Sequence, residues 1–195
     1  MGTLDAGAFT TAALAEALNI PELQVFELPF LFNSDEEADA VMDAMSKQIS
    51  NILDKKGVKL VMWGTNGWRS FGTKKKPVMK PADLKGLKMR SQESDVYINF
   101  YKAAGATPVP ISTPEVLVAL KTGMVDGFDQ TPIFAVSTGW IGAVKNFTLT
   151  NHIYQPGVVI VSKKTYEKLP AELKPLLIAD GKREAEDVPR IARVD

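Results

Sequence analysis

The most regular hydrophobic spacing in the chain lies between residues 34 and 57. Ser34 and Glu37 have the spacing of a capping box, in which both side chains bond to backbone groups at a helix start. Apolar residues then recur at every third or fourth position and form one face: Ala38, Val41, Met42, Met45, Ile49, Ile52 and Leu53. Gly57 provides the left-handed residue that often ends a helix. The pattern therefore predicts a long amphipathic helix.

Short apolar runs alternate with helical patterns in the rest of the chain. Six strands are expected, over residues 58–63, 87–90, 108–111, 125–129, 147–150 and 157–162. Three helices are expected between them, over residues 94–104, 113–123 and 132–144. Strands that alternate with helices predict an α/β fold with a mostly parallel sheet and helices on its faces. In the helical pattern after residue 162, Pro175 and Pro189 predict breaks or kinks.

Composition and charge exclude several classes of protein. The 195 residues include 23 basic and 23 acidic side chains, so net charge favours neither a nucleic acid nor an anionic membrane as a partner. No apolar run approaches the roughly 18 residues of a membrane span, so no direct membrane insertion is expected. Cysteine is absent, which excludes disulfides, thiolate zinc sites and cysteine nucleophiles. The length allows one domain or two small ones.

Few residues suggest catalysis or metal binding. His152 is the one histidine, and no nucleophile or orienting group is indicated beside it, so we expect it to form structural hydrogen bonds. The sequence contains no G-x-S-x-G, H-E-x-x-H, Walker or G-x-G-x-x-G motif. Asp126 and Asp129 are close in sequence, but a hard cation needs more oxygen ligands on a shaped loop. No metal and no cofactor is therefore expected.

Two arginines stand at positions that favour ligand binding. Arg69 is expected in a glycine-rich turn, residues 64–68, directly after a buried strand, and Arg90 ends the expected strand 87–90. Ligands of open α/β sheets bind beyond the carboxyl ends of the strands. The planar guanidinium can hold a carboxylate through two parallel hydrogen bonds. For either arginine alone, this evidence slightly favours a surface ion pair.

The order of several motifs is similar to that of the solute-binding receptors of TRAP (tripartite ATP-independent periplasmic) transporters. The motifs are D-L-K-G-L-K-M-R at residues 83–90, G-A-T-P-V-P at 105–110, and A-L-K-T-G-M-V-D-G at 119–127. Weaker matches are V-F-E-L-P-F-L-F at 25–32 and L-T-N-H-I at 149–153. The resemblance covers about residues 21–170 and implies a two-lobed periplasmic binding protein fold.

This resemblance also implies which residues bind the ligand. In the family, the arginine that ends the D-L-K-G-L-K-x-R motif pairs with the ligand's carboxylate, and that position is Arg90. A second arginine often assists, and Arg69 looks like its counterpart. Many members have an asparagine after V-D-G, where this chain has Asp129 and Gln130 and is one residue longer. Thr113 replaces a common phenylalanine, and Gln92 replaces a common proline. These departures favour a polar ligand such as a sugar acid or hydroxy acid.

The resemblance divides the chain into lobe I, residues 1–65, lobe II, residues 66–153, and a crossing strand that returns to lobe I, residues 154–195. It implies that the chain is incomplete and lacks the first strand–helix units and the closing C-terminal segments. It also implies a periplasmic location, although the N-terminus shows no signal peptide pattern. The implied partners are a small organic acid and the TRAP membrane subunits.

Two other functions remain open at the level of the sequence. A carboxylate-handling enzyme with a similar two-lobed α/β fold would need acid–base groups around Arg90. A signalling module, in which a receptor lobe reports its ligand to a sensor kinase, would normally continue into a membrane span. The expected function is nevertheless that of a receptor that binds a small organic carboxylate without transforming it.

Overall fold

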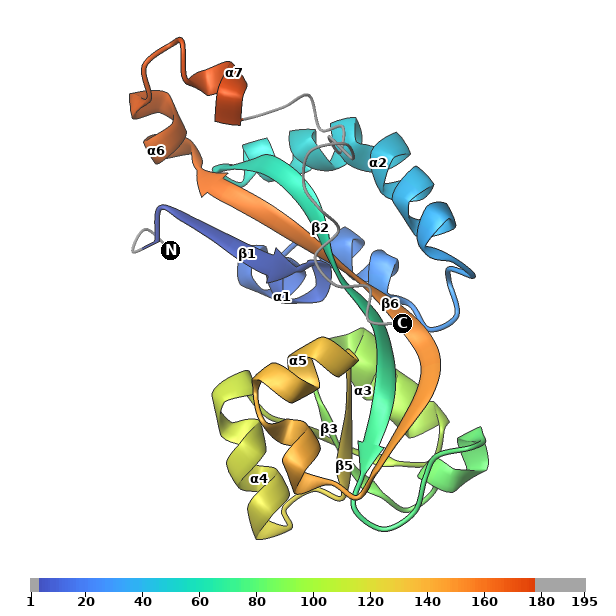
Figure 1. Ribbon diagram of the computed structural model, residues 1–195. Helices are drawn as coiled ribbons and strands as arrows, with labels where there is room; N and C mark the ends of the chain where they lie inside the picture. The colour runs from blue at the N-terminus through green and yellow to red at the C-terminus, as the bar shows by residue number, and fades with distance from the viewer. Residues whose placement is uncertain (1–3, 178–195) are drawn as a thin grey trace. The chain divides into compact units, whose positions relative to one another are not determined.

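The computed structural model describes residues 4–177, and its ribbon is shown in Figure 1. The chain's internal contacts divide it into two compact units. Within the described range, unit 1 contains residues 4–9, 36–64 and 157–177, and unit 2 contains residues 10–35 and 65–156. Strands β2 (Val58–Thr73) and β6 (Asn146–Ser162) run through both units.

Unit 1 contains the long helix that the hydrophobic spacing predicts. Helix α2 (Asp35–Lys55) buries Ala38, Met42, Ile49 and Leu53 on one face. Gly57 follows it with a φ of 82°, which confirms the expected left-handed stop. At the start of β2, the indole Nε1 of Trp63 donates a 2.6 Å hydrogen bond to Ser46 Oγ of α2. The helix is therefore fixed to the strand by both apolar and polar contacts.

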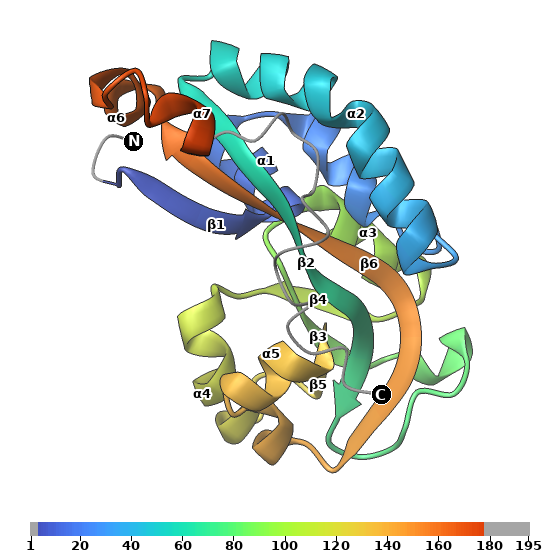
Figure 2. The same ribbon diagram turned by 45° about the horizontal axis from the view of Figure 1, so that its top comes forward.

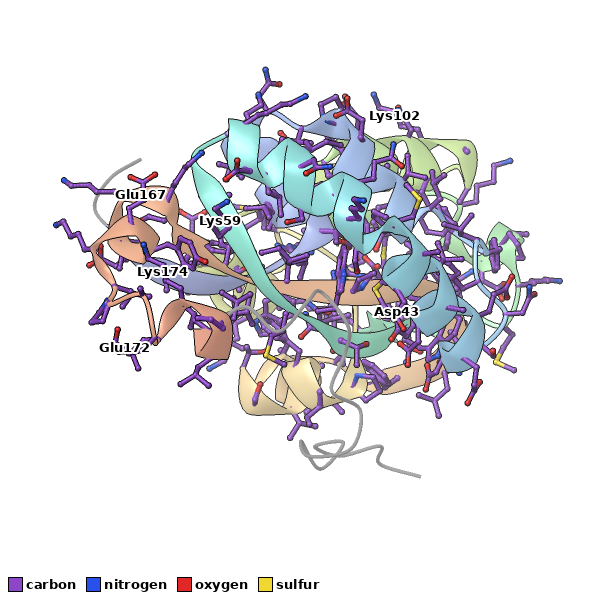
Figure 3. The ribbon with its side chains drawn as sticks, turned by 90° about the horizontal axis from the view of Figure 1, so that it is seen from above. Asp43, Lys59, Lys102, Glu167, Glu172 and Lys174 are labelled. Atoms are coloured by element: carbon purple, nitrogen blue, oxygen red, sulfur yellow. The ribbon has the colours of Figure 1, made fainter. Side chains whose placement is uncertain are left out.

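The remaining elements of unit 1 are strand β1 (Ala6–Thr10) and two short helices, α6 (Lys163–Lys168) and α7 (Lys174–Leu177). Lys59 of β2 and Lys174 of α7 place their Nζ atoms 5.7 and 5.5 Å from the ring centre of Tyr166 (Figure 3). The helical segment is interrupted at residues 169–173, whereas Pro175, where the break was expected, lies within α7. The second expected break, at Pro189, lies outside the described residues.

Unit 2 contains the strands whose carboxyl ends carry the expected site. They are β3 (Lys88–Ser91), β4 (Thr107–Pro110) and β5 (Gly127–Gln130). The helices are α1 (Thr11–Leu18), α3 (Asp95–Ala103), α4 (Val116–Thr122) and α5 (Pro132–Ser137). Short 3-10 turns are η1 (Pro21–Glu27), η2 (Pro81–Leu84), η3 (Thr113–Glu115) and η4 (Trp140–Ala143). The strand order in the sheet is β1-β6-β2-β5-β3-β4.

Helices cover both faces of the sheet in unit 2, as the alternating pattern predicts (Figure 2). Phe128 of β5 packs with residues of α4, α5 and η4, among them Leu120, Ala135 and Trp140. On the other face, Met89 of β3 packs with Phe71 and with Tyr101 of α3. The central strands are therefore buried on both sides.

The sheet is mixed rather than mostly parallel. Strand β3 pairs in parallel with both β4 and β5, but β5 pairs antiparallel to β2. The expected glycine-rich turn at residues 64–68 is also wrong, because these residues continue β2, with Gly67 at a φ of 89°. Residues 147–150 and 157–162 are likewise parts of one strand, β6. The neighbouring strand β6, whose Gln155 bonds to Asn66, outweighs the local turn preference of glycine.

Two helix predictions need smaller corrections. The expected helix 132–144 is divided into α5 and η4, because Gly139 adopts a φ of 73° between them. The expected helix 113–123 begins with the 3-10 turn η3 before α4, and it stops at Gly123 as predicted. The first difference lies in the middle of the expected helix, where glycine easily adopts a positive φ, and the second lies at a helix start.

The structure groups residues 10–35 with unit 2, whereas the sequence division placed them in lobe I. The physical reason is a set of hydrogen bonds within unit 2 that centres on the buried carboxylate of Glu27. Residues 58–63 and 157–162 both belong to unit 1, as the predicted pair of crossing strands requires. The assignment of residues 1–65, 66–153 and 154–195 to receptor lobes stays a prediction.

Candidate ligand-binding site

Arg90 lies at the carboxyl end of β3 and is only 2% exposed. Its Nε and Nη2 donate to the carbonyl oxygen of Ile111 at 3.0 and 2.9 Å. Its guanidinium carbon lies 5.3 Å from the ring centre of Trp140. The Nη1 atom is buried and has no hydrogen-bond partner among the described residues. One side of the guanidinium is therefore fixed by the protein, and Nη1 remains as a donor for a ligand.

Arg69 is fully buried inside β2, and its guanidinium is paired within the protein. Its Nε donates to Asp129 Oδ2 and its Nη2 to the Asp129 carbonyl, both at 2.6 Å. Its Nη1 donates to Gln130 Oε1 at 3.2 Å. The guanidinium also lies 4.5 Å from the ring centre of Tyr97. Arg69 is therefore held by the protein at all three of its nitrogens.

Asp129 is the main counter-charge of Arg69. Besides its bond to Arg69, it accepts a 2.5 Å hydrogen bond from the hydroxyl of Tyr101. Burial, the largest single effect, would raise the pKa of Asp129, but the charge and hydrogen bond of Arg69 and the contact with His152 together outweigh burial and hold that pKa well below its usual range. Burial alone would lower the pKa of Arg69. The Asp129 carboxylate and other nearby groups outweigh burial, so this pKa is raised above its ordinary value. The pair is therefore ionised at neutral pH.

Arg90 has no carboxylate partner of this kind. Burial lowers its pKa to about 10, and the positive charge of Arg69 contributes to the same shift. Because this value is still well above neutral pH, Arg90 carries a positive charge in a buried environment. A buried cation without an adjacent carboxylate is stabilised by an anionic ligand. This contrast favours Arg90 over Arg69 as the anchor of an anion.

His152 lies on β6, next to the ion pair. Its ring stacks on Phe71 at 4.2 Å between centres and on Phe100 at 5.3 Å. Its Nδ1 lies 2.9 Å from the hydroxyl of Thr150, and its Nε2 lies 3.5 Å from Asp129 Oδ2. The two aromatic rings fix the imidazole plane, which supports the prediction of a structural histidine.

Glu27 forms a second polar centre in unit 2, which the sequence reasoning did not single out. Its buried carboxylate accepts hydrogen bonds from Thr11 Oγ1 at 2.8 Å and from the backbone N–H of Ala12 at 2.6 Å. It also accepts from Gln155 Nε2 at 3.0 Å and from the hydroxyl of Tyr97. Glu27 thus connects α1, α3 and β6. An acidic residue inside the apolar run 25–32 was the available signal.

The predicted site residues do not all come together. Arg69, Asp129 and Gln130 form one hydrogen-bonded group, and Arg90 ends the neighbouring strand β3. The amide oxygen of Gln130 also accepts from the backbone N–H of Thr131 at 2.8 Å.

Thr113 and Gln92 are not part of this hydrogen-bonded group. Thr113 is exposed on η3, and Gln92 is half-buried directly after β3. In the part of the chain that the structure describes, neither side chain bonds to Arg69 or Arg90. Their role in ligand binding stays a prediction.

Two further buried hydroxyls lie at the same strand ends. Ser91 follows Arg90, and Thr131 follows β5; both are 0% exposed. Neither Ser91 Oγ nor Thr131 Oγ1 has a hydrogen-bond partner among the described residues. Serine and threonine are too common at strand ends for the sequence to have indicated them.

The described residues offer no group of three or more His, Cys, Asp or Glu side chains that could hold a metal ion. Asp126, considered with Asp129 in the sequence, accepts instead from the backbone N–H of Lys88 at 2.9 Å. Between residues 4 and 177, no helix is both long and apolar enough to cross a membrane.

A buried, partly unpaired arginine at the strand ends of a helix-covered sheet is an arrangement suited to a small anion. The comparison with known families agrees. Residues 1–189 match the model of the DctP family, described as bacterial extracellular solute-binding protein, family 7. The chain belongs to this family of solute-binding proteins, and the predicted family and the α/β fold class are confirmed.

Two curated relatives illustrate the similarity. The chain is 37% identical to a solute-binding protein of Verminephrobacter eiseniae over 90% of this chain and 52% of that protein. It is 32% identical to the 2,3-diketo-L-gulonate-binding periplasmic protein of Escherichia coli, over 92% of this chain and 55% of that protein. The chain therefore spans about half the length of these relatives.

Solved structures show the same fold. A TRAP periplasmic solute-binding protein from Polaromonas sp. JS666, bound to D-erythronate, is 34% identical with a TM-score of 0.85, over 91% of this chain and 58% of that one. One from Sulfitobacter sp. NAS-14.1, bound to β-D-galacturonate, is 30% identical with a TM-score of 0.85, over 90% of this chain and 58% of that one.

Proposed function

We propose that this chain is part of an extracytoplasmic receptor that binds a small organic carboxylate for TRAP-type secondary transport. The observation that carries this proposal is the guanidinium of Arg90. It is buried and charged, it is fixed on one side by Ile111 and Trp140, and its Nη1 has no partner among the described residues. A ligand carboxylate provides both the missing acceptor and the missing negative charge.

A sugar acid or hydroxy acid is the ligand class that the chain favours. The groups around Arg90 include several polar side chains, which a purely hydrocarbon acid would leave unpaired at a cost. The similar proteins bound to D-erythronate and β-D-galacturonate support this class, because both ligands combine a carboxylate with hydroxyl groups. Gln130, Asp129, Gln92 and Thr113 are proposed to contribute polar contacts or to orient the arginines.

The proposed location is the periplasm, and the proposed partners are the TRAP membrane subunits that receive the ligand. We also propose that the ligand leaves chemically unchanged. The acid and the base at the Arg69 ion pair are Asp129 and His152. Asp129 is bonded to Arg69 and Tyr101 and is held ionised. Such a carboxylate has a poor ability to exchange a proton near neutral pH.

The test is calorimetry and native mass spectrometry on the full-length protein with a panel of D-erythronate, D-galacturonate, D-gluconate and succinate. We expect at least one of these to bind and to be recovered unchanged. A chemically altered ligand would favour the enzyme alternative, and absence of binding across the panel would contradict the receptor.

Variants of Arg90 identify the anchor. Arg90→Ala is expected to weaken binding by roughly 2–5 kcal/mol, about thirty- to several-thousand-fold, because a desolvated charge pair loses one partner. Arg90→Lys should restore little, since an ammonium group cannot bond the Ile111 carbonyl and the ligand in the fixed fork of a guanidinium. Lys102→Ala, a change at an exposed lysine of α3, is the control and should bind normally (Figure 3). Near-native affinity in both folded Arg90 variants would move the anchor to Arg69.

A further inference from the structure

We propose that the hydroxyl groups of Ser91 and Thr131 bind the oxygen substituent on the carbon next to the ligand's carboxylate. This inference rests on the proposed function, because it requires a carboxylate on Arg90. It assigns a recognition role to two residues, and it narrows the ligand class to acids that carry an oxygen at this α-carbon.

The other buried hydroxyls of unit 2 show that Ser91 and Thr131 are unusual. Each of the others has a partner: Thr11 bonds to Glu27 at 2.8 Å, Ser70 to Asn151 at 3.2 Å, Thr73 to the Lys76 carbonyl at 2.6 Å, and Ser94 to Gln24 at 3.0 Å. Only Ser91 and Thr131, among the buried serines and threonines described in this unit, have none. Buried polar groups are paired in most proteins, so the exceptions need an explanation.

The two exceptions occur at one place in the fold. Strands β3 and β5 run in parallel, with Met89 beside Gly127 and Arg90 beside Phe128. The same register puts Ser91 beside Asp129, and Thr131 two residues further along. Both unpaired hydroxyls therefore lie at the carboxyl ends of adjacent strands, where the unpaired Nη1 of Arg90 also lies. A fourth unpaired buried side-chain atom described in unit 2, His152 Nε2, lies 3.5 Å from Asp129 Oδ2. The three unpaired groups at the strand ends can be explained together by one ligand.

The chemistry of the hydroxyl group suggests which part of the ligand it meets. Arg90 offers only donors and suits the carboxylate, whereas Ser91 and Thr131 can both donate and accept. They therefore match an alcohol, which also donates and accepts, or a sugar ring oxygen, which accepts. In a sugar acid or hydroxy acid, such an oxygen is bonded to the carbon next to the carboxylate. A hydrocarbon acid would bury both hydroxyls unpaired and should bind more weakly.

The test compares two probes that differ in one hydroxyl. They are D-erythronate and its 2-deoxy analogue, 3,4-dihydroxybutanoate with the same configuration at C3. We expect the unmodified full-length protein to bind D-erythronate at least about tenfold more tightly, the effect of one good hydrogen bond. In the double variant Ser91→Ala/Thr131→Val, the affinity for D-erythronate should fall to about that for the analogue, whose own affinity should change by less than roughly threefold.

The stability of the ligand-free variants provides a second measurement. Because both hydroxyls are unpaired, Ser91→Ala and Thr131→Val should leave the melting temperature unchanged or raise it. Thr73→Val is the matched control, because it removes a paired hydroxyl on β2, beside Gly127 at the opposite end of β5 from Thr131. It should lower the melting temperature and preserve the preference between probes. A lower melting temperature in the Ser91 and Thr131 variants would show a structural role and overturn the inference.

The possible results separate this inference from the proposed function. If the double variant weakens both probes equally, the hydroxyls hold the carboxylate itself, and the assignment to the α-carbon oxygen is wrong. If succinate binds in an Arg90-dependent way but D-erythronate does not, this inference fails and the receptor proposal stands. If no carboxylate of the panel binds, both fail together.

Discussion

At the scale of the residue, two buried arginines on the strands that flank β5, β2 and β3, have different roles. Arg69 is neutralised by Asp129 and is bonded at all three nitrogens, so it forms part of the framework. Arg90 is bonded to a carbonyl alone and keeps one donor and its charge for a ligand. The local sequence places both arginines at or just after the carboxyl end of an expected strand. The hydrogen-bond partners in the structure distinguish their roles.

His152 allows a test of the structural interpretation at this scale. Its ring packs parallel to the rings of Phe71 and Phe100 and is 1% exposed, so it has little freedom to reach a ligand. We expect His152→Gln to change ligand affinity by less than about threefold, below roughly 1 kcal/mol, while the loss of ring stacking lowers stability. Calorimetry with circular dichroism as the folding check measures both effects. Complete loss of binding in a folded His152→Gln protein would show that the imidazole contacts the ligand.

At the scale of the element, β5 is placed by close backbone contacts that tolerate no side chain. A Cβ on Gly127 would meet the carbonyl oxygen of Gly72 on β2 inside van der Waals contact, and Met89 Cε on β3 at 3.1 Å. Gly127 thus allows β5 to fit between β2 and β3, and Phe128, Asp129 and Gln130 follow directly from it. The strand that carries the counter-charge of Arg69 depends on this glycine.

Gly127→Ala should therefore destabilise the protein by roughly 1–3 kcal/mol, the usual effect of forcing extra atoms into packed surroundings. Gly142→Ala is the control, because a Cβ there would meet nothing within 4 Å. Urea unfolding of both variants gives the comparison. Equal stability of the two would mean that β5 can shift without cost and that the close approach does not fix its place.

At the scale of the whole molecule, the buried ion pair connects stability to pH. The pKa of Asp129 is lower in the folded protein than the ordinary value of 3.8, because Arg69 and His152 together outweigh the effect of burial. A carboxyl with a depressed folded pKa contributes stability that is fully present above its unfolded pKa. That contribution is lost as pH falls below about 4, at a slope of about 1.4 kcal/mol per pH unit for one proton.

We therefore expect the free energy of unfolding of the unmodified protein to fall more steeply between pH 4 and pH 3 than that of Asp129→Asn, whose amide does not titrate. Asp129→Asn leaves Arg69 without its counter-charge and should be less stable at neutral pH. If this variant does not fold, carboxyl carbon NMR on the unmodified protein gives the answer. A carboxyl of Asp129 that takes up its proton near pH 4 would contradict the assigned ion pair.

The sequence by itself determined those features that depend on neighbours along the chain. Helix α2, with its apolar face and its stop at Gly57, follows from spacing and a left-handed residue within one segment. The end of β3 at Arg90 and the α/β class follow from short apolar runs between helical patterns in the same way. The order of motifs was sufficient for the family, because a series of motifs is far more specific than any one of them.

Only the tertiary structure decided the features that depend on partners distant in sequence. Strand β2 continues through a glycine-rich segment because it lies beside β6, which is not encoded near residues 64–68. Asp129 is 60 residues from Arg69, so their bond appears only after β5 pairs with β2. The unpaired hydroxyls of Ser91 and Thr131 were hidden for the same reason: whether a buried polar group has a partner is a property of three-dimensional packing, not of local sequence.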